Sequence, residues 1–322
     1  MLDFNVSVSS QADADEIYDL IIIGGGPAGL TAGLYAARYK LRTLLLEKAA
    51  VSGGQLIATQ WVENYPGFPE PVLGQKLASD MESQARLFGL EVVSETVLSV
   101  ELEGEIKEVR TTHSTWKARS ILICTGSSPR RLDVPGEAEY SGKGVSYCAT
   151  CDGPFYPDKE VAVVGGGNSA FEESLFIAKY ASKITLIHRK DTFNADGILQ
   201  EKVKAEPKIK LITDSVLEKI DFADEAKRKI HIRNLKTKKK KIMSVDGVFI
   251  FVGNIPNTAL FEGKLKLKDG FIVTDRDHYT SVEGVWAAGD VQSKALRQVA
   301  TAVGDGAAAA FFIHKYLMKQ EK

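Results

Sequence analysis

The chain has 322 residues, a formal net charge of −1, 44% hydrophobic residues and 26% charged residues. This length favours roughly two domains, each large enough to bury its own hydrophobic core. The near-neutral charge excludes a bulk electrostatic attraction to nucleic acid or to an anionic membrane, so neither is expected as a partner.

Residues 1–17 are predicted to form a short flexible extension. Residues 1–16 are polar and acidic, and they lack the basic and apolar regions of a signal peptide. No run in the chain approaches the ~20 apolar residues of a membrane span. Three cysteines are too few for a disulfide scaffold. These features favour a reducing, cytoplasmic location.

A strand–helix–strand unit opens the folded part, with strands predicted at Asp19–Ile23 and Thr43–Leu46 and a helix at Ala28–Tyr39. The turn between strand and helix is a glycine-rich dinucleotide fingerprint, which lets backbone amides approach a pyrophosphate at a helix N-terminus. Glu47 ends the second strand, where a carboxylate accepts a hydrogen bond from a free ribose 2′-hydroxyl, as in FAD or NAD. The cofactor-binding residues predicted here are Gly24, Gly26, Pro27, Ala28, Gly29 and Glu47.

A longer loop is predicted at Val51–Leu73, and residues 120–126 form a buried strand that ends in a Thr-Gly turn at Thr125 and Gly126. Pro129 and Pro135 then punctuate a connection. The turn residues and the prolines together mark the start of a new domain.

A dithiol, Cys148-Ala149-Thr150-Cys151, precedes a second glycine fingerprint at residues 165–170. This fingerprint lies inside a second strand–helix–strand unit, Glu160–His188. Thiolates of Cys-X-X-Cys motifs are often reactive. Two nucleotide sites beside such a pair indicate a protein that transfers electrons between a nucleotide cofactor and the dithiol. Since the chain has neither a second Cys-X-X-Cys nor a His-X-X-X-His pair, no metal site is expected. The predicted nucleotide-binding residues are Gly165, Gly167, Asn168, Ser169 and Ala170.

The second site carries the opposite charge at the end of its second strand. His188, Arg189 and Lys190 stand where the first site has Glu47. Two cations suit a 2′-phosphate through charge-assisted hydrogen bonds, so NADP(H) is the expected nucleotide. The alternative is that Arg189 and Lys190 form only a solvated strand end.

The basic run Lys236–Lys241 separates two strand-like runs, residues 229–235 and 245–252. It is predicted to be a solvated hairpin turn rather than a binding patch. A stretch rich in turn-forming residues, 253–257, follows and is predicted to return the chain to the first domain.

The C-terminal part has a predicted strand at Gly284–Ala288, the dipeptide Gly289-Asp290, and a helix from about Gln298 to Met318. Asp290 is expected to reach a ribitol hydroxyl of the first cofactor, the alternative being a turn and helix cap. Too short to fold alone, this part completes the first domain. The expected domains are therefore residues 18–130 with 257–322, and residues 131–256, which carry the dithiol.

From Tyr18 to about Tyr316 the chain resembles the low-molecular-weight thioredoxin reductases of the pyridine nucleotide-disulfide oxidoreductase family. Besides the two fingerprints and the dithiol, the resemblance is carried by residues 53–56, 63–67, 188–190 and 288–290. It implies an α/β fold with two Rossmann-like, FAD- and NAD(P)-binding domains of three-layer ββα type, the second inserted in the first. It implies FAD contacts from Gly54, Gln55, Leu56, Asn64, Thr125, Gly126, Gly289, Asp290, Arg297, Gln298 and Val299.

The same resemblance implies thioredoxin or a thioredoxin-like protein as partner, and a homodimer. Cys151 would face the flavin, and Cys148 would exchange with the partner's disulfide. Asp152 is the candidate proton carrier, the alternative being a helix cap. The family's nucleotide loop carries a third cation where this chain has Asn194, and Lys190 replaces an arginine. NADH is therefore an alternative donor to NADPH.

Several alternatives stay open at this point. The chain could be the reductase component of an alkyl hydroperoxide system, a reductase fed by ferredoxin, a dithiol oxidase, or a redox sensor that does not turn over. The intact second fingerprint argues against the ferredoxin and oxidase alternatives. The remaining cysteine, Cys124, lies in an apolar strand and is expected to be an inert core residue.

Overall fold

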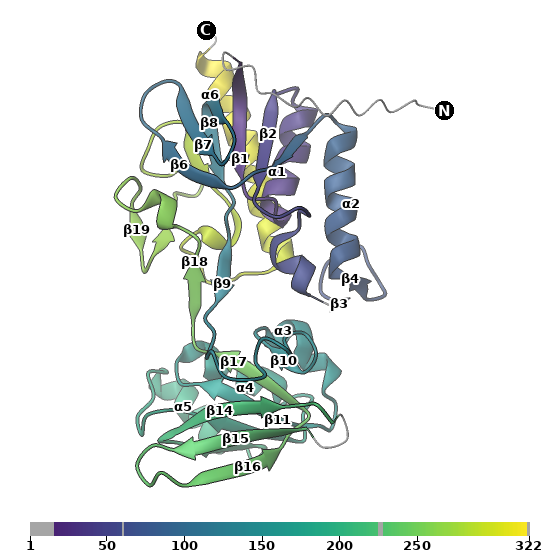
Figure 1. Cartoon of the computed structure of the whole chain (residues 1–322), viewed down its shortest axis with the longest axis vertical. Helices are drawn as coiled ribbons and strands as arrows, with labels where there is room; N and C mark the ends of the chain where they lie inside the picture. The colour runs from purple at the N-terminus through teal and green to yellow at the C-terminus, as the bar shows by residue number, and fades with distance from the viewer. Residues whose placement is uncertain (1–15, 60, 225–227, 321–322) are drawn as a thin grey trace. The chain divides into compact units, whose positions relative to one another are not determined.

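The structure is a computed structural model that describes residues 16–59, 61–224 and 228–320 (Figure 1). All but residues 16 and 17 of the predicted extension lie outside the described residues. The chain divides into two compact units. Unit 1 comprises the described residues of 1–59, 65–127 and 256–322, and unit 2 those of 60–64 and 128–255. Within the described ranges, no helix is long and apolar enough to cross a membrane.

Unit 1 is built on a seven-stranded sheet of order β5-β2-β1-β8-β7-β6, in which β21 also pairs with β8. Pairing is parallel among β5, β2, β1, β8 and β21, and antiparallel from β8 to β7 and β6. The strands are β1 (Ile17–Ile23), β2 (Thr43–Glu47), β5 (Glu91–Ser94), β6 (Val97–Glu101), β7 (Lys107–Thr111), β8 (Thr115–Ile123) and β21 (Val285–Ala287).

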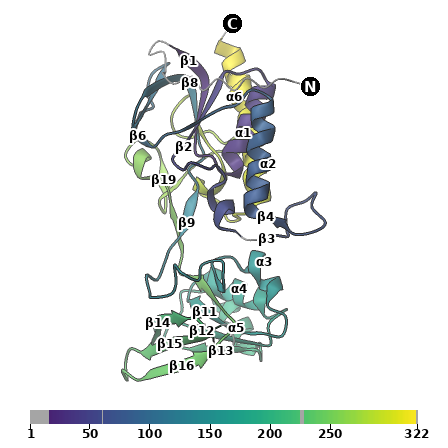
Figure 2. The same cartoon turned by 45° about the vertical axis from the view of Figure 1, so that its right-hand side comes forward.

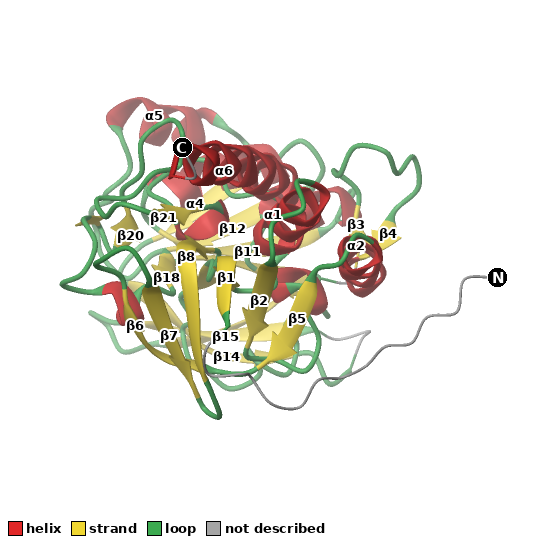
Figure 3. Cartoon of the chain, turned by 90° about the horizontal axis from the view of Figure 1, so that it is seen from above, coloured by secondary structure: helices red, strands yellow, loops and turns green. Residues whose placement is uncertain are grey.

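Both faces of this sheet are covered, which explains the unbroken apolar runs at residues 20–23 of β1 and 44–46 of β2. Leu20 and Ile22 of β1 pack into a core on the helical side, and Ile21 and Ile23 pack into a second core on the opposite side. Figure 3 shows the helices gathered on one side of the sheet. These helices are α1 (Pro27–Arg38), α2 (Gly74–Leu87) and α6 (Val299–Gln320).

The long C-terminal helix α6 packs closely on α1. A side-chain carbon added at Gly306 would lie 2.2 Å from the backbone oxygen of Ala28, so only a glycine permits this approach. This contact packs the C-terminal helix against the first helix of the chain, so the C-terminal part belongs to unit 1. It places the N-terminal turns of α1 and α6 in the same unit.

Unit 2 has a parallel five-stranded sheet of order β10-β17-β11-β12-β13 and an antiparallel three-stranded sheet of order β14-β15-β16 (Figure 2). One core lies between the parallel sheet and the helices, and another lies between the two sheets. This is the three-layer ββα arrangement, and the predicted fold class is confirmed. The elements are β10 (Val145–Ser146), α3 (Ala149–Asp152), η2 (Gly153–Phe155), β11 (Glu160–Gly165), α4 (Asn168–Ile177), β12 (Lys183–Ile187), α5 (Gly197–Ala205), β13 (Ile209–Ile212), β14 (Ser215–Asp221), β15 (Lys229–Asn234), β16 (Lys240–Ser244) and β17 (Gly247–Phe251).

The structure corrects one sequence prediction. The basic run is predicted to be a turn between two strands, but Lys240 and Lys241 begin β16, which pairs antiparallel with β15. The following run forms β17 in the other sheet. The start of β16 cannot be recognised from the sequence, because it consists of exposed lysines and a solvated edge strand has no apolar alternation. The turn is therefore shorter, residues 235–239.

The remaining elements are short. The predicted loop at Val51–Leu73 contains a 3-10 helix and two brief strands. Two further strands, β9 and β18, pair with each other along the two connections between the units. These short elements are η1 (Gly54–Ala58), β3 (Trp61–Val62), β4 (Val72–Leu73), β9 (Ser127–Pro129), β18 (Asn254–Pro256), η4 (Ala259–Phe261), β19 (Leu267–Lys268), β20 (Phe271–Ile272) and η5 (Gly289–Val291).

Candidate active site

The first glycine turn connects β1 to α1 and depends on close backbone packing. Gly24 has a φ of +110°, and a side-chain carbon at Gly29 would lie 2.0 Å from the Gly24 oxygen. In front of the helix N-terminus, by contrast, nothing lies within 4 Å of a side-chain carbon placed at Gly26. Pro27 starts the helix without leaving an amide unsatisfied. The turn thus leaves open space beside amides that suit a pyrophosphate.

Glu47, at the end of β2, is held against this turn. Its Oε2 atom accepts a hydrogen bond from the Gly25 amide at 2.7 Å, and its Oε1 atom accepts one from the Ala49 amide at 3.0 Å. Each carboxylate oxygen can accept a second hydrogen bond. The side chain is therefore oriented by the glycine turn and still able to receive a ribose hydroxyl.

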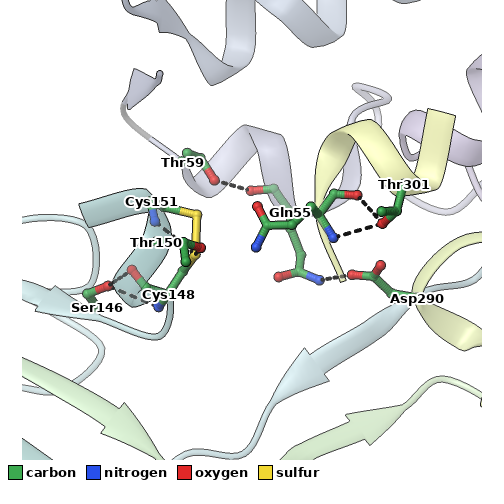
Figure 4. Close-up of a disulfide and its surroundings, with 9 residues drawn as sticks. Gln55, Thr59, Ser146, Cys148, Thr150, Cys151, Asp290 and Thr301 are labelled. Carbon is green, nitrogen blue, oxygen red and sulfur yellow. Dashed lines mark hydrogen bonds between the residues drawn. A yellow bond between two sulfur atoms is a disulfide. The ribbon is translucent and has the colours of Figure 1, made fainter. Parts of the chain in front are cut away.

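Asp290 and Gln55 meet in unit 1 although they lie 235 positions apart in the sequence. Gln55 Nε2 donates to Asp290 Oδ2 at 3.3 Å (Figure 4) and to the backbone oxygen of Ser127 at 3.0 Å. Asp290 Oδ1 is buried and has no hydrogen-bond partner among the described residues. Burial raises the pKa of this carboxyl, which the nearby Lys294 and Arg297 oppose.

A buried acceptor without a donor costs free energy unless a ligand supplies the donor. A ribityl hydroxyl of FAD is such a donor, and the open glycine turn accommodates its pyrophosphate. The residues present thus fit FAD. In this arrangement Asp290 would hold the ribityl chain, and Glu47 the ribose.

Sequence reasoning missed two residues, Asp305 and Lys294, that support the backbone at Gly289 and Asp290. Asp305 of α6 accepts a hydrogen bond from the Gly289 amide at 3.1 Å and pairs with Lys294. Both charged side chains are mostly buried. Asp305 is an acid within an otherwise small and apolar helical stretch, which is a signal the sequence did contain. Together they fix the backbone next to Asp290.

The other predicted FAD residues of unit 1 surround the same region. Gly54 lies against Gly26, Leu56 is buried, and Gly126 follows Thr125 with a φ of +69°. The Thr125 hydroxyl donates to the Asn257 oxygen, and the Asn257 side chain donates to the Thr125 oxygen, both at 2.7 Å.

The stretch before α6 also reaches this region. Arg297 donates to the Asp290 backbone oxygen at 3.3 Å, and its guanidinium lies 4.1 Å from the ring centroid of Phe271. The Gln298 backbone amide donates to the Thr301 hydroxyl, and Val299 is the first residue of α6. Asn64 is exposed on the loop after β3, and its role stays a prediction.

Replacing Asp290 by alanine is expected to weaken FAD binding about tenfold, because the buried acceptor for a ribityl hydroxyl is removed. The dissociation constant can be measured by titrating deflavinated protein with FAD and following flavin fluorescence. Asp80→Ala, at an exposed pair on α2, is the control and should leave the constant unchanged. Equal FAD affinity in the Asp290 variant and the control would contradict the assignment.

The dithiol lies in unit 2, where β10 leads into the short helix α3. Cys148 and Cys151 are joined in a disulfide (Figure 4). The Cys151 amide donates to the Cys148 sulfur at 3.2 Å, and the Thr150 hydroxyl lies 3.4 Å from it. The Ser146 hydroxyl accepts from the Cys148 amide at 3.1 Å. After reduction, the Cys151 amide and the Thr150 hydroxyl would stabilise a thiolate on Cys148 rather than on Cys151.

Asp152 follows the dithiol directly and is largely buried. Burial raises the pKa of its carboxyl, and a hydrogen bond with Ser146 opposes the rise. A carboxyl whose pKa is raised toward neutrality is better suited to carry protons than one at its ordinary value. Asp152 makes no side-chain capping hydrogen bond to η2, the 3-10 helix that follows it, and its role as proton carrier stays a prediction.

The second glycine turn joins β11 to α4 in the same unit. A side-chain carbon at Gly166 would lie 2.1 Å from the His188 ring, so the ring packs directly on the turn. The Asn194 amide donates to the Gly166 oxygen at 2.8 Å. Asn168 exchanges two hydrogen bonds with Asp196, at 2.8 and 2.9 Å. The loop after β12 is therefore held against the glycine turn.

The predicted nucleotide residues of unit 2 come together around this turn. Gly165 ends β11, Gly167 precedes α4, and Ser169 and Ala170 lie in its first turn. His188 follows β12, and Arg189 and Lys190 come next and are exposed. Burial lowers the pKa of His188, which disfavours a positive charge on this ring. The positive charge here thus comes from Arg189 and Lys190.

Cys124, the third cysteine, is free and buried in the core on the helical side of unit 1. Burial raises the pKa of its thiol. The prediction of an unreactive core residue agrees with this environment, because a thiol that stays protonated is a poor nucleophile.

The chain is similar to known proteins along nearly its whole length. A family model described as pyridine nucleotide-disulphide oxidoreductase matches residues 18–306. A thioredoxin reductase of Peptoclostridium acidaminophilum is 44% identical over 310 residues, covering 94% of this chain and 98% of that protein. One of Rickettsia felis is 45% identical over 305 residues, covering 93% and 98%. The crystal structure of thioredoxin reductase from Streptococcus pyogenes matches with a TM-score of 0.89 at 41% identity, covering 94% and 99%.

Proposed function

This chain belongs to the thioredoxin reductase family of pyridine nucleotide-disulphide oxidoreductases, and we propose that it carries reducing equivalents from NADPH to the disulfide of thioredoxin or a thioredoxin-like protein. The observation that carries the proposal is the disulfide of Cys148 and Cys151, one of whose sulfurs accepts an amide hydrogen bond. The alkyl hydroperoxide, ferredoxin, oxidase and sensor alternatives are not favoured by relatives that match nearly from end to end.

FAD and a pyridine nucleotide are the cofactors of this family. FAD, when bound, supplies a two-electron carrier that accepts a hydride and reduces a disulfide. We assign FAD to the glycine turn, Glu47 and Asp290 of unit 1, and the pyridine nucleotide to the glycine turn of unit 2. The support is the open space at Gly26, the buried acceptor on Asp290, and the two cations after β12.

The reduced dithiol then performs two exchanges. The Cys148 thiolate attacks one sulfur of the partner's disulfide, forming a mixed disulfide and releasing a partner thiolate that takes up a proton. Cys151 next attacks Cys148 in the mixed disulfide, which releases the second partner thiolate and restores the internal disulfide. Two electrons pass to the partner, and Asp152 exchanges protons with the sulfurs. We assign Cys148 to the attacking role because its sulfur accepts the amide hydrogen bond.

NADPH is proposed as the donor because Arg189 and Lys190 occupy the strand end that meets the ribose 2′ position. Anaerobic stopped-flow reduction of the purified holoenzyme by NADPH and by NADH, followed by flavin absorbance, tests this. NADPH should bleach the flavin at least about tenfold more efficiently, as expected for charge-assisted hydrogen bonds to the 2′-phosphate. A preference for NADH would show that the donor assignment is wrong, and failure with both would point to another donor.

We also propose a homodimer in the reducing cytosol. Large apolar side chains are exposed on or beside the helical layer of unit 1, and such patches are characteristic of interfaces. They are Tyr35 on α1, Leu87 and Phe88 at the end of α2, and Phe311 and Met318 on α6. Sedimentation equilibrium measures the mass in solution, and a monomer at micromolar concentration would contradict the proposal.

A further inference from the structure

The turn between β15 and β16 lies against the loop that follows β12. Lys236 of this turn places its Nζ atom 2.8 Å from Asp191 Oδ2 and 3.0 Å from Asp214 Oδ1. Backbone hydrogen bonds tie the same segments together, from the Asp214 amide to the Lys190 oxygen at 3.2 Å and from the Leu235 amide to the Asp214 oxygen at 2.6 Å. A lysine 45 positions after Asp191 is thereby brought beside the end of β12.

We propose that Lys236 is a third cation of the 2′-phosphate subsite and helps to set the preference for NADPH over NADH. The inference rests on the proposed function, in which NADPH is the donor. Lys236 would add a cation beside a loop in which residue 194 is a neutral asparagine. It comes from a different segment, the hairpin of the second sheet.

Charge balance supports this role. Asp191 follows Arg189 and Lys190 directly, and its carboxylate would repel a 2′-phosphate. Lys236 neutralises it: the ion pair lowers the pKa of Asp191 and raises that of Lys236. With Lys236, these adjoining segments carry three cations and two carboxylates, which leaves a net positive charge. Without it, Arg189 and Lys190 only balance Asp191 and Asp214, and the net charge falls to zero.

Geometry supports it as well. An ammonium group has three N–H donors, and two carboxylates use two of them, so one is left for a phosphate oxygen. The Lys236 side chain is 61% exposed, as is that of Asp191, so a nucleotide can reach it. Asn234 fixes the turn, because its Oδ1 atom accepts hydrogen bonds from the Lys236 amide at 3.1 Å and the Thr237 amide at 2.8 Å. The cation is held in place before a nucleotide arrives.

The matched control is Lys239, an exposed lysine on the same turn that carries the same charge. Lys239→Ala changes the net charge of the protein as much as Lys236→Ala does. Lys236→Arg keeps the cation and serves as the conservative variant. Two ligands separate the subsites: adenosine 2′,5′-bisphosphate carries the 2′-phosphate, and 5′-AMP lacks it.

Calorimetric titration of the full-length holoenzyme with each ligand gives the dissociation constants. Lys236→Ala should weaken adenosine 2′,5′-bisphosphate about tenfold and leave 5′-AMP within about twofold, because one charge-assisted contact is lost. Lys239→Ala should match the wild type, and Lys236→Arg should recover most of the affinity. The KM for NADPH should rise in parallel with no change in the KM for NADH.

Other outcomes would overturn the inference. Equal weakening of both ligands would mean that Lys236 only supports the loop, and equal effects at Lys236 and Lys239 would mean a diffuse field rather than a contact. No effect at Lys236 would also refute it while the wild type still preferred the 2′-phosphate. If the wild type itself showed no such preference, the proposal of NADPH as donor would fail, and the inference with it.

Discussion

Cys151→Ser is expected to lower thioredoxin reduction by more than about 1000-fold, because the mixed disulfide on Cys148 then has no internal thiol to resolve it. Reduction of the flavin by the pyridine nucleotide should stay within about twofold of the wild type, since that half-reaction does not involve the dithiol. Steady-state assays with thioredoxin measure the first rate, and anaerobic stopped-flow absorbance measures the second.

The same variant can identify the attacking sulfur. A thioredoxin with one active-site cysteine, loaded with thionitrobenzoate, should form a stable mixed disulfide with Cys151→Ser and release the coloured thiolate. Cys148→Ser should react much more slowly, because Cys151 is not the sulfur that accepts the amide hydrogen bond. Cys124→Ala, in the buried core, controls for loss of a cysteine. Faster trapping by Cys148→Ser would reverse the two roles.

Asp152→Asn is expected to reduce turnover with thioredoxin about 100-fold, because the amide cannot exchange protons with the sulfurs. The loss should appear in the rate of dithiol exchange and not in flavin reduction by the pyridine nucleotide. Asp158→Asn, the same change at an exposed acid of unit 2 that has no part in the dithiol site, is the comparison variant and should keep wild-type turnover. Turnover by Asp152→Asn above about a third of the wild-type rate would limit Asp152 to a structural role.

The same substitution should not unfold the protein. Burial raises the pKa of Asp152 above its ordinary value of 3.8, so the folded state holds its proton more tightly than the unfolded state. At pH values between the pKa of the unfolded state and the higher pKa of the folded state, the folded state binds more protons. The free energy of unfolding therefore falls as the pH rises through this range. Asparagine removes this penalty. Asp152→Asn should therefore melt at an equal or higher temperature than the wild type at pH 7, with the difference vanishing at low pH.

Differential scanning calorimetry of the wild type and of Asp152→Asn, from low pH to pH 7, measures the difference in melting temperature and checks its sign. A lower melting temperature for Asp152→Asn at pH 7 would mean that the ionised carboxylate is stabilised in the folded state, contrary to the direction of its pKa. The catalytic loss would then have to be separated from a loss of folded protein.

Much of the candidate site follows from local patterns. The two glycine turns, the dithiol with Asp152, and the acid or cations after the second strand of each unit are all short-range features. Each lies next to strands or helices whose apolar periodicity is strong enough to be recognised in the sequence. The burial of β1 and β11 on both faces agrees with their continuous apolar runs.

Other parts of the site are formed by residues far apart in the chain. Gln55 meets Asp290 across 235 positions, and Asp305 reaches the Gly289 amide only because α6 packs on α1. Lys236 reaches Asp191 only because the turn of the β15–β16 hairpin lies against the loop that follows β12. The lysine run resembles a turn in the sequence, because a strand edge facing solvent has no apolar alternation to mark it.

The sequence by itself determined the fold class, the two nucleotide turns and the redox pair, since these depend on the spacing of neighbouring residues and on the conformational freedom of glycine. Only the tertiary structure decided which distant side chains complete each site: the partner of Asp290, the support from Asp305, and the cation beside Asp191. The physical reason is that such contacts depend on how helices and sheets pack, and packing brings together residues whose separation along the chain carries no signal.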